Sequence, residues 1–169
     1  MRRRIGNMKI PLTKPYFDQE EEKAVIEVLR SGWVAQGPKV AELEKAISDY
    51  TGAEYAVATT SATTSLYLSL YIMGIGPGDE VIVPSHTFIA TSNVILQVGA
   101  TPIFVDIDLQ TYNIDPEKIE EKITAKTKAI MPVDQVGLPC ALDEISKIAK
   151  KHNLLILEDA ACALGASYH

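Results

Sequence analysis

Two acidic residues that follow a short apolar run near the end of the sequence are the first candidates for chemistry. Residues 154–157 are Leu, Leu, Ile and Leu, and Glu158 and Asp159 come directly after them. An apolar run without alternation is typical of a strand that is covered on both faces. In open α/β sheets the ligand crevice lies beyond the carboxyl ends of such strands, so we expect Asp159 to line a site.

A second candidate position is rich in hydroxyl groups. Residues 59–65 read Thr-Thr-Ser-Ala-Thr-Thr-Ser, and a helix-compatible stretch follows from Leu66. The first amide groups of a helix have no intrahelical acceptor, and the helix dipole favours negative charge there. The pattern therefore predicts an anion site that suits a phosphate group, although Ser61 or Thr63 would also serve as an ordinary N-cap.

A third candidate group follows the mainly apolar run of residues 80–84 and contains His86 and Phe88. The Phe88 ring suits either stacking on a ligand or packing in the core. No second His or Cys lies at ligand spacing from His86, so we expect no metal site.

An anion site, an aromatic ring and a carboxylate at one edge of a sheet are what pyridoxal phosphate (PLP) requires. Helix amides bind its phosphate, an aromatic face covers its ring, and an anion keeps its ring nitrogen protonated so that the ring can accept electrons. At about 4 Å and an effective dielectric constant near 20, such an anion contributes on the order of 4 kcal/mol before desolvation is subtracted. Asp159 is the candidate for this anion.

Helices and strands at regular spacing are expected to position these residues. Helical spacing and start and stop signals predict helices over residues 18–31 and 38–50. Apolar or β-branched runs at 55–59, 80–84, 102–106, 128–132 and 154–158 start 22 to 26 residues apart, which is the length of a strand, a loop and a crossover helix. The sequence therefore predicts an α/β fold, a three-layer αβα arrangement around a mostly parallel sheet.

Composition restricts the class of protein. The 169 residues carry a formal net charge of −6, which argues against non-specific nucleic-acid binding. We find neither a signal peptide nor the run of about 18 to 20 apolar residues of a membrane span, so we expect a cytoplasmic protein without a membrane partner. The two cysteines are expected to be reduced. Residues 1–7 are interpreted as a disordered extension or a mis-called start.

The order of these motifs resembles the nucleotide-sugar aminotransferase family of the DegT and StrS type, which has the aspartate-aminotransferase-like (type I) PLP fold. The likeness covers nearly the whole chain. It is carried by IPLTKP from Ile10, SGWVAQGPKVAELEKAISDYTGAEYAVA from Ser31, SATTSLYLSL from Ser61, GPGDEVIVPSHTFIATSN from Gly76, GATPIFVDID from Gly99 and ILEDAACALGA from Ile156.

The resemblance implies a role for several residues. The usual Ser-Gly-Thr of the family is Ser61, Ala62 and Thr63 here, and Ala62 and Thr63 are implied to hold the cofactor phosphate. Phe88 is implied to stack on the ring and Asp159 to pair with the ring nitrogen. Gly32, Trp33 and Gly37 fall in the stretch that lies near the sugar-nucleotide entrance in this family.

Two positions depart from the family pattern. Cys162 stands where a Gln or His usually contacts the ring hydroxyl of the cofactor, and Asp134 stands where a His is common. Both changes affect the expected electrostatics around the ring. The family's Schiff-base lysine lies beyond the position of His169, so no catalytic residue is expected in this chain. Residues 8–169 are interpreted as the N-terminal part of the PLP-binding large domain, truncated and without its C-terminal domain.

The activity that the resemblance implies belongs to the intact protein. It is a PLP-dependent transfer of an amino group, from glutamate as amino-acid donor, to a nucleotide-linked keto sugar for polysaccharide biosynthesis, by a homodimer. The chain alone is expected to be inactive. Two alternatives stay open: a non-catalytic module that binds cofactor or sugar nucleotide, and a related PLP-dependent sugar dehydratase.

Overall fold

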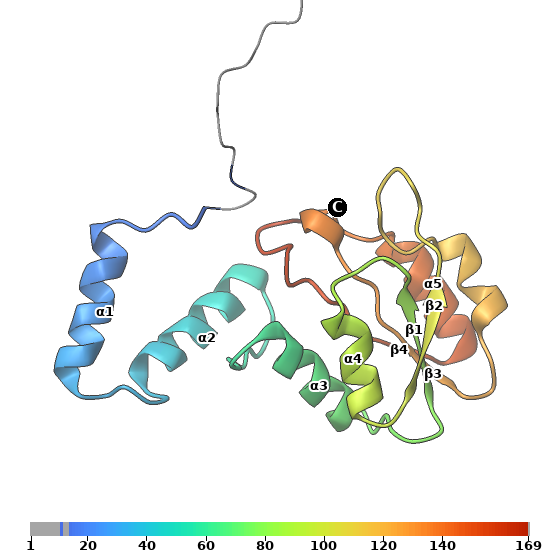
Figure 1. Ribbon diagram of the computed structural model, residues 1–169, viewed down its shortest axis with the longest axis horizontal. Coiled ribbons are helices and arrows are strands. Elements are labelled where there is room, and N and C mark those ends of the chain that lie inside the picture. The colour runs from blue at the N-terminus through green and yellow to red at the C-terminus, as the bar shows by residue number, and fades with distance from the viewer. Residues whose placement is uncertain (1–10, 12–13, 169) are drawn as a thin grey trace, which may run out of the picture. The chain divides into compact units, whose positions relative to one another are not determined.

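The computed structural model (Figure 1) describes residue 11 and residues 14–168, and these fall into two compact units divided after Ala58. Each unit is described by itself. The extension predicted at residues 1–7 lies outside the described residues.

The first unit contains the two helices expected from the sequence, α1 (Gln19–Ser31) and α2 (Pro38–Thr51). A capping box starts α1, since the Asp18 side chain accepts the Glu20 N–H at 2.8 Å and the Glu21 side chain accepts the Asp18 N–H at 2.7 Å. Pro38 starts α2. Neither helix contains a buried residue. Both predicted helices are confirmed.

The strand predicted over residues 55–59 is wrong, because this segment has no regular structure. A strand needs a neighbour to accept and donate its backbone hydrogen bonds. No such neighbour is present among the described residues, and the Tyr55 and Val57 side chains are each 79% exposed.

The second unit is built around four parallel strands: β1 (Glu80–Pro84), β2 (Thr101–Val105), β3 (Thr127–Ile130) and β4 (Leu155–Ile156). Their order across the sheet is β2-β1-β3-β4. The other four predicted strands are therefore confirmed, although β4 has two residues instead of five. An isolated parallel bridge between Val133 and Asp159 continues the pairing of β3 and β4 beyond their ends.

Helices cover both faces of this sheet, as the α/β prediction requires (Figure 1). On one face, α3 (Ala62–Ile72) and α4 (Ala90–Gln97) pack with sheet residues into a core that includes Leu70, Val83, Val94 and Met131. On the other face, α5 (Leu142–His152) packs on a core that includes Ile82, Ile130 and Ile145. Ile119, which lies between the short 3₁₀ turns Pro116–Lys118 and Glu120–Lys122, belongs to the same core.

Parallel strands bring their carboxyl ends to one edge of a sheet. Residues 85–89 follow β1 and lead into α4, residues 131–134 follow β3 and lead into the 3₁₀ turn Gln135–Gly137, and residues 157–163 follow β4. These three segments form the edge at which the site is found. Within the described ranges, no helix has the length and apolar character that a membrane span requires.

Candidate functional site

A pocket of about 250 Å³ lies at the carboxyl edge of the sheet, within the second unit. Five of the six cofactor-binding residues predicted from the sequence line it. The lining residues are Ala62, Thr63, Leu66, Thr87, Phe88, Ala90, Val133, Gln135, Asp159, Ala161 and Cys162.

The sixth predicted residue, Ser61, lies next to the pocket lining in the sequence but caps a helix instead of lining the pocket. It is the N-cap of α3, where its Oγ accepts the Thr64 N–H at 3.2 Å and its carbonyl oxygen accepts the Ser65 N–H at 3.1 Å. Ser61 is not among the residues that line the pocket. Its geometry is that of the ordinary N-cap that the sequence left open as an alternative.

The first turn of α3 nevertheless offers an anion site next to this cap. Ala62 and Thr63 are the first two residues of the helix and line the pocket, and their N–H groups have no intrahelical acceptor. The dipole of α3 adds partial positive charge at the same end. A phosphate group fits the chemistry of this position.

Three hydrogen bonds fix Asp159: one from its backbone N–H and one to each of its two carboxylate oxygens. The Asp159 N–H donates to the Pro132 carbonyl at 2.9 Å, which fixes the residue to the segment after β3. Its Oδ2 accepts the Thr91 hydroxyl at 3.0 Å, and its Oδ1 accepts the Ala161 N–H at 3.3 Å. Only 8% of Asp159 is exposed, so nearly the whole residue is removed from water although it lines the pocket.

No cation accompanies this buried carboxylate: among the residues that the structure describes, no Lys, Arg or His nitrogen lies within 4.0 Å of it. Buried charges in proteins are normally paired. A positively charged ring nitrogen in the pocket would supply the missing partner. The residues present therefore fit a phosphorylated pyridine ring, with its phosphate at α3 and its nitrogen at Asp159.

Phe88 presents an aromatic face at the same pocket and is 75% exposed. Its segment is tied to the loop after β3, because the Gln135 Nε2 donates to the His86 carbonyl oxygen at 2.8 Å and lies 3.2 Å from the His86 Nδ1. The next residue, Val136, has a φ of 54°, a conformation that is strained for a β-branched side chain. This turn keeps Gln135 against the Phe88 segment.

Buried Asn113 holds the same turn from behind. Its Nδ2 donates to the carbonyl oxygens of Leu138 and Pro139 at 2.9 and 3.1 Å, and its Oδ1 accepts the Gln135 N–H at 2.9 Å. Three hydrogen bonds from one amide thus fix the backbone that carries Gln135.

The two departures from the family pattern have different locations. Cys162 lines the pocket and is exposed, as its predicted role near the ring requires. Asp134 does not line the pocket, so the expectation that it alters the electrostatics facing the ring is not supported by its position. The Asp134 side chain is buried, and its Oδ1 accepts the Cys140 N–H at 2.9 Å.

Asp134 instead contacts Glu158. Burial raises the pKa of Glu158 to about 7, and the hydrogen bond to Asp134 and the negative charge of Asp134 act in the same direction. The Glu158 carboxyl therefore titrates close to neutral pH. Burial, and then the neighbouring Asp134, also raises the pKa of the Cys140 thiol strongly, so Cys140 is an inert neutral thiol.

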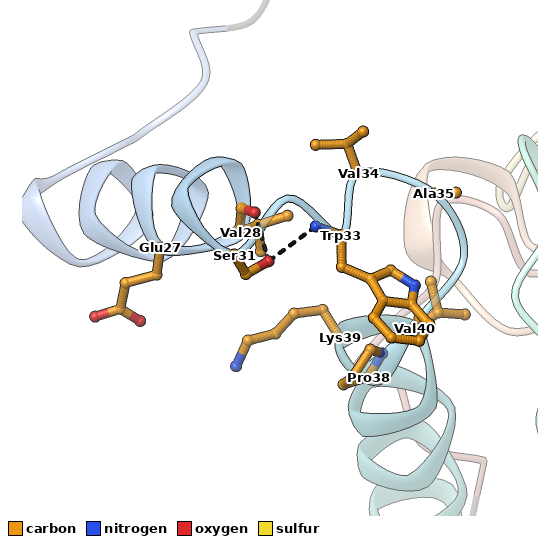
Figure 2. Close-up of a pocket in the computed structure, with 10 residues that line it drawn as sticks. Glu27, Val28, Ser31, Trp33, Val34, Ala35, Pro38, Lys39 and Val40 are labelled. Atoms are coloured by element: carbon orange, nitrogen blue, oxygen red, sulfur yellow. Dashed lines mark hydrogen bonds between the residues drawn. The ribbon is translucent and has the colours of Figure 1, made fainter.

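Trp33, the predicted substrate contact, belongs to the first unit. It lines a cavity of about 400 Å³ formed by α1, α2 and the loop between them (Figure 2). The Trp33 N–H donates to the Ser31 Oγ at 3.1 Å, and its indole Nε1 donates to the Gln36 carbonyl at 2.9 Å. The indole lies so close to Gly37 that any Cβ at this position would overlap with it.

Sequence reasoning missed Thr87, Thr91 and Gln135. Thr91 contacts Asp159 across 68 residues of sequence, and Gln135 contacts His86 across 49. One signal was present: Thr87 and Thr91 are four residues apart, a spacing that would bring two hydroxyls together on a helix, although α4 begins only at Ala90. No comparable signal pointed to Gln135.

Comparisons with known proteins agree with this geometry. The profile of the DegT/DnrJ/EryC1/StrS aminotransferase family matches residues 15–169. The chain is 48% identical over 161 residues to a GDP-perosamine synthase from Caulobacter vibrioides, covering 95% of this chain and 43% of that protein. It is 46% identical over 164 residues to a UDP-4-amino-4-deoxy-L-arabinose–oxoglutarate aminotransferase from Shewanella sediminis, covering 97% of this chain and 42% of that protein.

A solved structure is similarly close. Spr1654 from Streptococcus pneumoniae, described as a sugar aminotransferase and solved in a PMP-form and a PLP-form, superposes in the PMP-form with a TM-score of 0.91 at 40% identity. The match covers 95% of this chain and 44% of that one. The chain thus spans about two fifths of the length of the relatives that it matches.

Proposed function

Because the chain belongs to the DegT/DnrJ/EryC1/StrS aminotransferase family, we propose that it forms the N-terminal part of the cofactor-binding large domain of a sugar aminotransferase. Its fold is that of the type I PLP-dependent sugar aminotransferases, and its cofactor is pyridoxal phosphate. The activity of the whole protein, its substrates and its partners are part of the proposal, since the chain spans only about two fifths of its relatives.

The proposed reaction moves an amino group from glutamate to a keto sugar that is linked to a nucleotide. Two relatives support the substrate class, because GDP-perosamine and UDP-4-amino-4-deoxy-L-arabinose are both nucleotide-linked amino sugars. The word oxoglutarate in the second name supports the donor, since 2-oxoglutarate is the keto acid that glutamate becomes when it loses its amino group. These names favour transamination over dehydration or simple binding.

Each lining residue has one task in this proposal. When bound, pyridoxal phosphate supplies a ring that accepts electrons from the amino-bearing carbon of the substrate. The Ala62 and Thr63 amides bind the phosphate, and the exposed Phe88 ring covers one face of the cofactor. Asp159 holds the proton on the ring nitrogen, and Cys162 lies near the ring hydroxyl.

The Schiff-base lysine belongs, in this proposal, to a part of the protein outside these 169 residues. No lysine is among the residues described as lining the pocket. We therefore expect the 169-residue chain alone to be unable to transfer amino groups. The proposal also includes a homodimer in the cytoplasm, in which exposed apolar residues of the first unit, such as Leu29 and Trp33, are available for contacts with a partner or the substrate.

One observation carries the proposal: a buried carboxylate that has no cation partner among the described residues, in a pocket that also contains the first turn of a helix. An opposite charge at about 4 Å and an effective dielectric constant near 20 is worth on the order of 4 kcal/mol, or up to about a thousandfold in binding. Loss of the Asp159 charge should therefore be costly for both cofactor affinity and turnover.

The test is Asp159→Asn in the full-length protein. We expect a loss of affinity for pyridoxal phosphate and a fall in amino transfer from glutamate to a nucleotide-linked keto sugar, each of one to three orders of magnitude. The matched control is Asp106→Asn, an exposed aspartate that follows β2 but does not line the pocket. Unchanged cofactor affinity and turnover in Asp159→Asn would contradict the proposed function.

A further inference from the structure

Two threonines form a hydrogen-bonded chain that ends at the Asp159 carboxylate. The Thr91 side chain is fully buried in α4, and its Oγ1 lies 3.0 Å from the Asp159 Oδ2. The Thr87 Oγ1 lies 3.0 Å from the Thr91 Oγ1, and Thr87 lines the pocket. These hydrogen bonds therefore connect Thr87 at the pocket, through Thr91 in the first turn of α4, to the Asp159 carboxylate.

The direction of these hydrogen bonds follows from the chemistry of the groups. An ionised carboxylate only accepts hydrogen bonds, and a threonine hydroxyl has a single proton to donate. Thr91 must therefore donate its proton to Asp159. Its oxygen is left as an acceptor, so Thr87 is the donor in the second bond. Hydrogen bonds in such a row strengthen one another where water is excluded.

The scaffold around Thr91 leaves it little freedom. Its β-branched side chain has few rotamers in a helix, and its N–H donates to the Phe88 carbonyl at 3.1 Å. Its neighbours Ala90, Ser92, Val94 and Ile95 are buried as well. Thr91 thus fixes one carboxylate oxygen of Asp159 from a rigid element, while the Ala161 N–H at 3.3 Å fixes the other oxygen.

We propose that Thr91, supported by Thr87, is a positioning residue that holds the Asp159 carboxylate in the orientation in which it accepts the ring N–H of the cofactor. This inference rests on the proposed function. Thr91 does not itself contact the cofactor in this arrangement. It acts by preventing rotation of the carboxylate and by occupying one lone pair of Oδ2, while the Ala161 N–H occupies one lone pair of Oδ1, so that a remaining lone pair is directed at the ring.

The test compares two ligands that differ only at the ring nitrogen. Pyridoxamine 5′-phosphate binds without a covalent bond to lysine, and its 1-deaza analogue has a carbon in place of the ring nitrogen. Their dissociation constants are measured by calorimetry in the full-length protein. The variants are Thr91→Val, which removes the hydroxyl at nearly constant shape, Thr91→Ser, which keeps a hydroxyl, and Thr87→Val.

The matched control is Ser92→Ala. Ser92 is the next residue of α4, is also buried, and its hydroxyl donates to the Ile89 carbonyl at 3.1 Å instead of to the site. It therefore reports the cost of removing a buried hydroxyl from the same helix.

We expect Thr91→Val to weaken binding of pyridoxamine 5′-phosphate by about tenfold to a hundredfold, the usual cost of a hydrogen bond to a charged group. The deaza analogue, which has no ring N–H, should lose less than about threefold. Thr91→Ser should restore most of the affinity, and Ser92→Ala should leave both constants unchanged. Thr87→Val should show a smaller loss with the same preference for the nitrogen-containing ligand.

A purely structural role of Thr91 predicts a different result, namely equal losses for both ligands, and that result would overturn the inference. Failure of Thr91→Ser to restore affinity would overturn it too. If Thr91→Val does not fold, Thr87→Val tests the inference instead. An equal loss of affinity for both ligands in Thr87→Val would then overturn it. Equal binding of the two ligands by the unmodified protein would instead contradict the proposed contact between Asp159 and the ring nitrogen.

Discussion

The raised pKa of Glu158 makes the stability of the fold depend on pH in a defined direction. The pKa of Glu158 is raised from 4.5 to about 7 in the folded protein, first by burial and then by Asp134. Between these two values the folded state holds a proton that the unfolded state has released. Since stability rises with pH only where the unfolded state binds more protons, this group makes stability fall as pH rises from about 4.5 to about 7.

The size of the effect follows from the interval between the two pKa values. One pKa unit corresponds to about 1.36 kcal/mol, so the full interval corresponds to about 3.4 kcal/mol. The Glu158 residue is partly exposed, and water screens such a group. We therefore expect about 1 to 1.5 kcal/mol of stability to be lost across the window. The loss is complete above about pH 7 and absent below about pH 4.5.

Glu158→Gln isolates this contribution, because a neutral amide keeps the shape of the side chain and a hydrogen-bond donor toward Asp134 without titrating. The free energy of unfolding is measured by urea denaturation at pH values from 4.5 to 8 for both proteins. The variant should gain about 1 to 1.5 kcal/mol relative to the unmodified protein as pH rises through the window.

The control for this experiment is Glu121→Gln, which changes an exposed glutamate of the same unit whose only described ion pair is with Lys122 at 3.9 Å. It should retain the pH dependence of the unmodified protein. Parallel stability curves for Glu158→Gln and the unmodified protein would refute the reasoning, and so would a relative loss of stability in the variant as pH rises.

Three further predictions concern single side chains. Ser61→Ala removes the cap of the Thr64 N–H and should lower the free energy of unfolding by about 1 kcal/mol, as measured by denaturant titration; no change would show that water replaces the cap. Gly37→Ala should displace the indole of Trp33, the only tryptophan of the sequence, and shift its fluorescence to longer wavelength, whereas an unchanged spectrum would contradict the close packing. Cys162→Gln adds a stronger hydrogen-bonding group to the pocket and should tighten binding of pyridoxamine 5′-phosphate by about two- to tenfold in calorimetry, and weaker binding would place Cys162 away from the ring hydroxyl.

The elements that local signals define were predictable from the sequence. Helix α1 begins at a capping box and ends at Gly32, and α2 begins at Pro38 and ends at Gly52. The limits of β1 also agree with the predicted residues 80–84, because this central strand is paired along its whole length by β2 and over Glu80, Val81 and Ile82 by β3.

The elements that depend on distant partners were less predictable. Residues 55–59 have the composition of a strand, but no strand among the described residues pairs with them. Within the part of the chain that the structure describes, strand β4 pairs only with β3 and is limited to Leu155 and Ile156, although the apolar run is longer. Composition indicates which segments can form strands, whereas pairing decides which of them do.

In the candidate site, too, local signals were predictive, whereas contacts between distant segments were not. Asp159 and Phe88 could be placed at one edge because each follows a predicted strand, and this argument needs only the topology of a parallel sheet. The hydrogen bonds of Thr91 and Gln135 could not be placed, because each joins residues on different segments and depends on side-chain geometry. The roles assigned to these residues in cofactor binding stay predictions until the variants are measured.

Glu158 and Asp159 are neighbours in the sequence but serve opposite faces of the sheet. Successive side chains of an extended segment point to opposite faces. Accordingly, Asp159 contacts Thr91 of α4 and lines the pocket, whereas Glu158 contacts Asp134, whose other partner is Cys140 in the core beneath α5. On one face, the Thr91 hydroxyl and the Ala161 N–H fix the Asp159 carboxylate at the pocket. On the other face, burial and the neighbouring Asp134 raise the pKa of the Glu158 carboxyl to about 7. Of these two adjacent acids at the end of one strand, only Asp159 lines the pocket, so Asp159 is the candidate for the contact with the cofactor.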